Sequence, residues 1–125
     1  MLASRAHYTY NFAGLEETTL SSPPLGAGRH VIGAELTPTR RLGMHAKLVV
    51  DGDVVAESDI PRTAPFRFAL HGEGMCCGYD DGTPVSQAYA SPFRFTGVLH
   101  DVTVDVSGAP VADRMAEVQR AWMVQ

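Results

Sequence analysis

The sequence contains only two cysteines, Cys76 and Cys77, and they are adjacent. Adjacent cysteines cannot link distant parts of a fold as the disulfides of small secreted domains do. Lysine is scarcer still, with Lys47 alone, and ten basic residues face fourteen acidic ones for a net charge of -4. Nucleic-acid-binding proteins gather basic residues on one face, so we expect no nucleic acid partner.

Long apolar runs are also missing. No stretch approaches the roughly 20 apolar residues that a membrane-spanning helix needs, and residues 1–11 lack the charged region and apolar core of a signal peptide. We therefore expect a soluble protein without membrane contact and, given the cysteines, a cytoplasmic location. The 125 residues suit a single domain over 1–125.

Catalytic motifs are absent too. The chain has no Gly-x-Ser-x-Gly nucleophile elbow and no Gly-x-x-x-x-Gly-Lys phosphate loop. The sequence therefore nominates no catalytic residue, and we expect that the chain alone is not an enzyme.

Short β-rich segments separated by turn residues are what the sequence does contain. Residues 6–12 and 29–36 are rich in types that suit a pleated surface, and each segment predicts a strand. Proline and glycine in residues 13–28 predict a connection with room for a short strand, and residues 37–43 predict a loop. Asp51-Gly52 joins two further β-rich runs and predicts a tight antiparallel hairpin.

Two later segments alternate strongly. Phe66–Leu70 has an aromatic face and predicts a half-buried strand, and its Pro-Phe-Arg-Phe entry recurs at residues 92–95. Residues 98–106 alternate valine with polar residues, which predicts a strand with its valines facing a core. His100 shares the valine parity, so we expect a hydrogen-bonded histidine in the core or at its rim.

The period changes after Gly108. Apolar residues at helical spacing predict one amphipathic helix, docked on this domain or on a neighbouring one, with the stripe Val111, Met115, Val118 and Trp122. The whole pattern predicts an all-β fold, an antiparallel β-sandwich of the jelly-roll or concanavalin type with one C-terminal α-helix. A partly open barrel and a single antiparallel sheet backed by the helix, an α+β fold, are the alternatives.

The connection over residues 72–91 combines four glycines, three acids, two tyrosines and both cysteines. Long connections in compact domains are often functional, so the candidate ligand or interface residues lie here. They are Glu73, Tyr79, Asp80, Asp81, Gln87 and Tyr89.

Three hypotheses concern the chemistry of this loop. Glu73, Asp80 and Asp81 offer oxygen ligands for calcium, but their spacing matches no EF-hand and acids commonly serve turns, so we expect no cofactor or metal. Tyr79 and Tyr89 could stack on a sugar while Asp80 or Gln87 forms hydrogen bonds, unless the tyrosines only pack the loop onto the sandwich. The two cysteines are expected to be buried, inert thiols.

Three stretches of the chain, Tyr8–Gly14, Leu48–Ile60 and Phe68–Val106, resemble the C-terminal region of bacterial arylsulfatases. The most specific part is Gly72-Glu73-Gly74 with Gly78–Val85, followed by Tyr89, Pro92-Phe93 and Phe95-Thr96-Gly97. The resemblance implies a region that follows a large alkaline-phosphatase-like domain. That domain carries the calcium ligands and a formylglycine nucleophile made from a cysteine in a Cys-x-Pro-x-Arg motif.

Neither Cys76 nor Cys77 lies in such a motif, so no catalytic residue of the family carries over to this chain. Relatives commonly have Gly-Arg-Asp where this chain has Gly78-Tyr79-Asp80, so any contact that this arginine makes in the family is not expected here. The resemblance implies a non-catalytic accessory domain or subunit that contributes to structure, assembly or covering of the substrate site. Its partner would be a sulfatase catalytic domain or a second copy of the chain. An independent lectin-like carbohydrate-binding module is the alternative.

Overall fold

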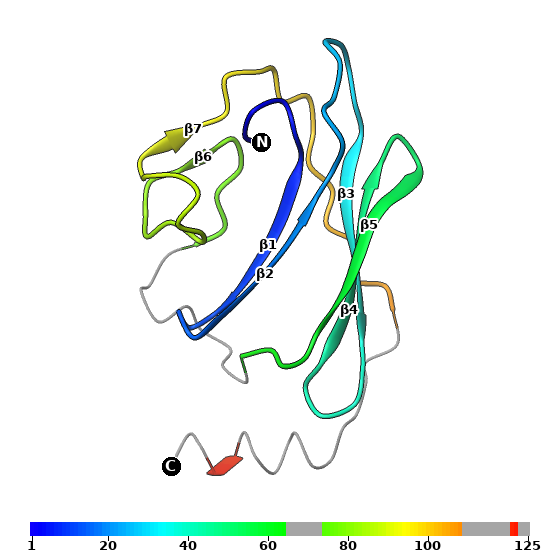
Figure 1. Ribbon diagram of the computed structural model, residues 1–125, viewed down its shortest axis with the longest axis vertical. Coiled ribbons are helices and arrows are strands. Elements are labelled where there is room, and N and C mark those ends of the chain that lie inside the picture. The colour runs from blue at the N-terminus through cyan, green and yellow to red at the C-terminus, as the bar shows by residue number, and fades with distance from the viewer. Residues whose placement is uncertain (65–73, 109–120, 123–125) are drawn as a thin grey trace.

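The computed structural model describes residues 1–64, 74–108 and 121–122, and the strands among them pair in antiparallel sheets. Figure 1 shows the sheets. The all-β, antiparallel class predicted from the sequence is confirmed for this part of the chain. The strands are β1 (His7–Phe12), β2 (Glu16–Ser21), β3 (Ile32–Pro38), β4 (Met44–Val50), β5 (Asp53–Ile60), β6 (Tyr79–Asp80) and β7 (Phe93–Arg94).

Strands β1 and β2 form a hairpin in which His7 pairs with Ser21 and Phe12 with Glu16. The Asn11 side chain accepts a hydrogen bond from the Gly14 amide at 2.7 Å, and Gly14 has a φ of 77°. Asparagine and glycine suit such turns because one bonds the local backbone and the other adopts positive φ without a steric cost. The stretch 13–28 therefore contains the short strand that the sequence allowed.

Strands β3, β4 and β5 form a second sheet with β4 in the centre. Asp51 and Gly52 have φ angles of 52° and 89°, so the predicted Asp-Gly hairpin between β4 and β5 is confirmed. Strand β3 begins later than predicted and extends to Pro38, in the expected loop. Proline is tolerated there because β3 is an edge strand within this sheet.

The hydrophobic core lies between the β1–β2 hairpin and the β3–β4–β5 sheet. Alternate residues of β4 are buried, as period-2 burial requires. Tyr8 and Tyr10 pack against the core from β1. The buried apolar residues are Ala6, Leu20, Ala46, Leu48, Val50 and Ile60.

The prediction of a strand over residues 98–106 is wrong. No strand forms there, and the side chains of its four valines are between 53% and 86% exposed. His100 is exposed as well, so its predicted place in the core or at its rim is also wrong. Alternation of side-chain type indicates which residues share a face, but a strand also needs a hydrogen-bonded neighbour. In Figure 1 this segment runs as an extended trace after β7.

Three further predictions concern a strand, a helix and the two cysteines. The predicted strand Phe66–Leu70 lies outside the described residues, and so does the predicted helix except for residues 121 and 122, which are helical. The prediction of buried thiols is wrong, because Cys76 and Cys77 are both free and exposed. Within the described part of the chain, no helix is long and apolar enough to cross a membrane.

Candidate functional site

The loop predicted as the functional region is docked on the β1–β2 hairpin. The Asn11 side-chain amide donates a hydrogen bond to the Val85 carbonyl at 2.9 Å. The Ser86 hydroxyl donates to a carboxylate oxygen of Glu17 at 2.9 Å, and Ser86 is buried. These contacts join residues about seventy positions apart and give the loop a fixed place against β1 and β2.

Tyr89 holds the loop together from inside. Its hydroxyl donates a hydrogen bond to Oδ2 of Asp80 and accepts one from the Val85 amide at 3.1 Å. Its ring centroid lies 5.1 Å from that of Phe93. Burial, followed by the hydrogen bond to Asp80, raises the pKa of Tyr89. The hydrogen bonds of the hydroxyl and the ring contact with Phe93 indicate that Tyr89 packs the loop. They disfavour the alternative in which Tyr89 stacks on a sugar.

Asp80 is engaged by the loop itself. Oδ1 of Asp80 accepts a hydrogen bond from the Gly82 amide at 3.3 Å while Oδ2 accepts from Tyr89. Asp81 is exposed, and Glu73 lies outside the described residues. In residues 1–64 and 74–108, no three His, Cys, Asp or Glu side chains come together as metal ligands. The carboxylate of Asp80 thus serves the turn.

The structure divides the candidate residues between two depressions. One, of about 390 Å³, is lined by Tyr79, Asp80, Asp81 and Tyr89. The other, of about 690 Å³, is lined by Gln87 and Tyr89 with polar neighbours that include Asn11. Of the candidate residues, Tyr89 lines both depressions, together with Gly82 and Thr83.

Tyr79 and Cys76 form an exposed pair beside the smaller depression. The hydrogen bond between the phenol and the thiol raises the pKa of Tyr79, and the nearby charge of Asp81 adds to this. Tyr79 is 46% exposed, so it is the more exposed of the two candidate tyrosines.

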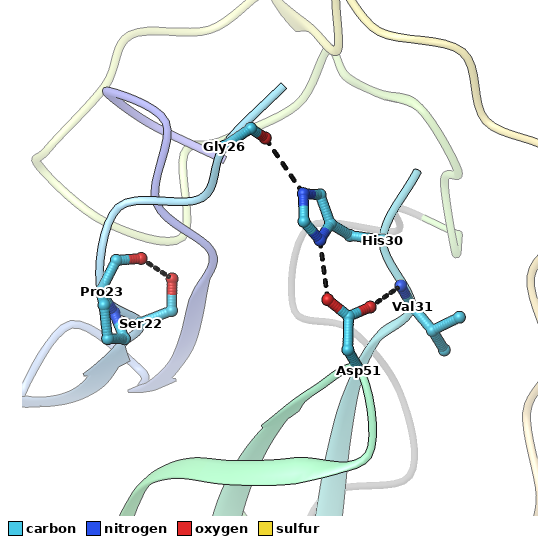
Figure 2. Close-up of polar contacts among 6 residues, drawn as sticks. All are labelled: Ser22, Pro23, Gly26, His30, Val31 and Asp51. Carbon is cyan, nitrogen blue, oxygen red and sulfur yellow. Dashed lines mark hydrogen bonds and ion pairs between the residues drawn. The ribbon is translucent and has the colours of Figure 1, made fainter. Parts of the chain in front are cut away.

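Sequence reasoning missed a histidine–carboxylate pair at the Asp-Gly turn. Figure 2 shows Nδ1 of His30 facing Oδ2 of Asp51 at 2.8 Å, and Nε2 facing the Gly26 carbonyl at 3.0 Å. Oδ1 of Asp51 accepts a hydrogen bond from the Val31 amide at 2.8 Å. The hydrogen bond to Asp51, then that to Gly26, raises the pKa of His30, and the pKa of Asp51 is lowered by the same bond.

The pair does not activate a nucleophile. The hydroxyl of Ser22, the buried serine drawn in Figure 2, donates to the Pro23 carbonyl at 2.6 Å and accepts from the Ala6 amide at 3.0 Å. Both nitrogens of His30 already have partners. A general base needs a nitrogen within hydrogen-bond reach of the proton that it removes, so this arrangement is structural.

A second histidine bridges strands β4 and β5. Nδ1 of His45 lies 2.6 Å from a carboxylate oxygen of Asp59, and Nε2 lies 3.2 Å from one of Glu57. The hydrogen bond to Asp59, then that to Glu57, raises the pKa of His45. This favours the imidazolium form, an exposed cross-strand pairing of opposite charges.

Comparison of the chain with protein-family models, curated proteins and solved structures finds no match.

Proposed function

We propose that the chain is a non-catalytic accessory domain or subunit of an arylsulfatase-like enzyme. The observation that carries this proposal is the apolar surface of residues 98–106, the valine segment. Val98, Leu99, Val102, Val104 and Val106 are all exposed there. Soluble monomers seldom expose large contiguous apolar patches, which commonly mark an interaction site.

Strand β3 adds to this surface. Its side chains are exposed along the whole strand, including Ile32 and Leu36. Edge strands offer unpaired backbone groups to a partner unless they are covered. Only six apolar side chains of the described residues are buried, a small core for a chain of this length. A partner that covers the valine segment would enlarge that core.

We also propose a finer fold, a jelly-roll-like sandwich with a docked C-terminal helix. Support for the sandwich comes from the core, which lies between the β1–β2 hairpin and the β3–β4–β5 sheet. The exposed valine segment adds no strand to this sandwich, and its valines would be buried by the partner.

We favour a catalytic domain over a second copy as the partner. The resemblance to the arylsulfatase C-terminal region supports this choice.

Co-expression with an arylsulfatase catalytic domain encoded in the same genome tests the proposal. We expect a one-to-one complex on size-exclusion chromatography, with the amides of residues 98–106 protected from hydrogen exchange. The double substitution V102D/V104D should abolish the complex. Leu15→Asp should leave it intact, because Leu15 is also an exposed apolar residue but lies on the β1–β2 turn. A chain that stays monomeric beside the catalytic domain, or that only pairs with itself, would contradict the proposal.

A lectin-like role is the second candidate, and the depression beside Gln87 favours it. That depression, of about 690 Å³, has Asn11, Ser86 and Ser91 on its walls, and polar groups in a concave site suit a sugar. Calorimetry with oligosaccharides should then show binding that Gln87→Ala weakens. Silence across a glycan array would remove this candidate.

A further inference from the structure

A depression of about 810 Å³ lies between two segments of the chain. One wall is the loop over residues 26–30, and another is the segment from Phe93 to Val98 with His100. Residues 3 and 4, before β1, contribute to the lining as well. The depression is separate from the loop residues discussed above.

The charged side chains that line this depression are basic. Arg29, Arg94, His30 and His100 are on its walls, and none of its lining residues is acidic. Asp51 offsets the charge of His30. The two arginines have no such partner, since neither guanidinium forms a hydrogen bond or an ion pair with another described residue. Two arginines thus remain available to an anion.

The loop over residues 26–30 adds backbone donors. The amides of Gly26 to His30 form no hydrogen bond with described residues. Figure 2 shows how His30 closes this loop onto the Gly26 carbonyl and ties it to the β4–β5 turn through Asp51. A Cβ at Gly26 or Gly28 would meet nothing within 4 Å, so the backbone there can be approached closely. Unpaired amides in a glycine-rich loop are suited to bind oxyanions.

Apolar side chains supply the rest of the wall. Phe95, Ile32 and Val98 line the depression and are exposed. The ring of Phe95 lies against Gly97, where an added Cβ would be 2.5 Å from the ring. This contact gives the aromatic ring a defined position. Small-molecule sites typically combine such apolar walls with a few polar groups that orient the ligand.

We propose that this depression binds a small anion in which a carboxylate, sulfate or phosphate group is attached to an aromatic or alkyl group. Arg29 and Arg94 form charge-assisted hydrogen bonds with the oxyanion, and the amides of residues 26–30 complete its coordination. The apolar part of the ligand packs against Phe95 and Ile32. Val98 and His100 of the valine segment line the depression. The contacts assigned to Arg29, Arg94 and the amides of residues 26–30 need no partner, so this inference does not depend on the proposed accessory role.

The test is isothermal calorimetry of the full chain with 2-naphthyl phosphate and 2-naphthyl sulfate at low salt. Inorganic phosphate and 2-naphthol each supply half of the expected ligand chemistry and should bind more weakly than either probe. The double variant R29Q/R94Q should weaken binding about tenfold or more, as the loss of charge-assisted hydrogen bonds predicts. Arg40→Gln, an exposed arginine in the β3–β4 loop, is the matched control and should bind like the parent chain.

Amide chemical shifts locate the site independently of affinity. The probes should move the amide resonances of residues 26–30, and raised salt should weaken binding because exposed charges are screened. Both arginines are exposed, so the double variant should keep the thermal midpoint of the parent chain. Unchanged affinity in R29Q/R94Q, equal binding of 2-naphthol, or absence of saturable binding would each overturn the proposal. A preference between the two probes identifies the type of oxyanion.

Discussion

Residues 1–64 and residues 74–108 are built differently. The first region contains five strands of six to eight residues and every buried apolar side chain of the described core. The second has two strands of two residues each, and its buried residue is the polar Ser86. The first region is held by local turns and apolar burial, the second by a few long-range polar contacts. Strands therefore pair regularly in the region where tight turns place consecutive strands side by side.

Strand β4 and the valine segment make the comparison sharpest, because both alternate in sequence. Leu48 and Val50 of β4 are buried between two paired neighbours, whereas Val102 and Val104 are exposed. The same alternation of apolar residues is thus buried in β4 and exposed in the valine segment, and the presence of neighbouring strands makes the difference.

Truncation of a core residue should break the first region. Leu48→Ala removes a side chain that is 1% exposed, and we expect it to lower the free energy of unfolding by about 2–5 kcal/mol. Val104→Ala is the matched change in the second region and should stay within about 0.5 kcal/mol of the parent chain. Urea unfolding measures both. Equal losses would mean that the valine segment is packed in the chain alone.

The Asp-Gly turn should be the next most sensitive position. Gly52 has a φ of 89°, so Gly52→Ala places a Cβ in the left-handed region and should cost about 1–2 kcal/mol of unfolding free energy. Gly74→Ala lacks this strain and has nothing within 4 Å of the added Cβ. If thermal unfolding gave the two variants the same midpoint, the turn would not set the register of β4 and β5.

Removal of the Tyr89 hydroxyl should loosen the second region and leave the first intact. Tyr89→Phe loses the hydrogen bonds to Asp80 and Val85, each worth about 0.5–1.5 kcal/mol. Hydrogen exchange should accelerate in residues 78–91 and stay unchanged in β4. Acceleration in both regions would contradict their independence.

The smallest effect concerns pH. The raised pKa of His30 contributes stability that is fully present below about pH 6.5, the unfolded value, and is lost as pH rises through the folded value. The lowered pKa of Asp51 contributes stability above 3.8 that is lost as pH falls through its folded value. Asp51→Asn keeps a turn-forming residue before Gly52 and should bring the pKa of His30 down.

Titration of the imidazole resonances by NMR measures this change. His45 is the internal control, because its raised pKa comes from Asp59 and Glu57 and should persist in the Asp51→Asn variant. A His30 pKa that did not fall would show that Asp51 is not its cause.

The sequence predicted the parts of the fold that local chemistry determines. Asp51 and Gly52 predicted the hairpin because few residues adopt positive φ. The composition of residues 6–12 predicted the first strand. The valine segment failed because a strand needs a partner that alternation does not identify. Among the candidate residues, the Tyr89–Asp80 bond joins positions nine apart within an irregular loop. No sequence spacing predicts this hydrogen bond, and none predicts the hydrogen bond between His30 and Asp51.

Hydrogen exchange of residues 98–106, measured in the chain alone and with the arylsulfatase catalytic domain, tests the central claim most directly. Exposed segments without backbone hydrogen bonds exchange fast, and burial at an interface slows them. The account predicts fast exchange in the chain alone and strong protection in the complex. Protection in the chain alone, or fast exchange in both samples, would contradict it.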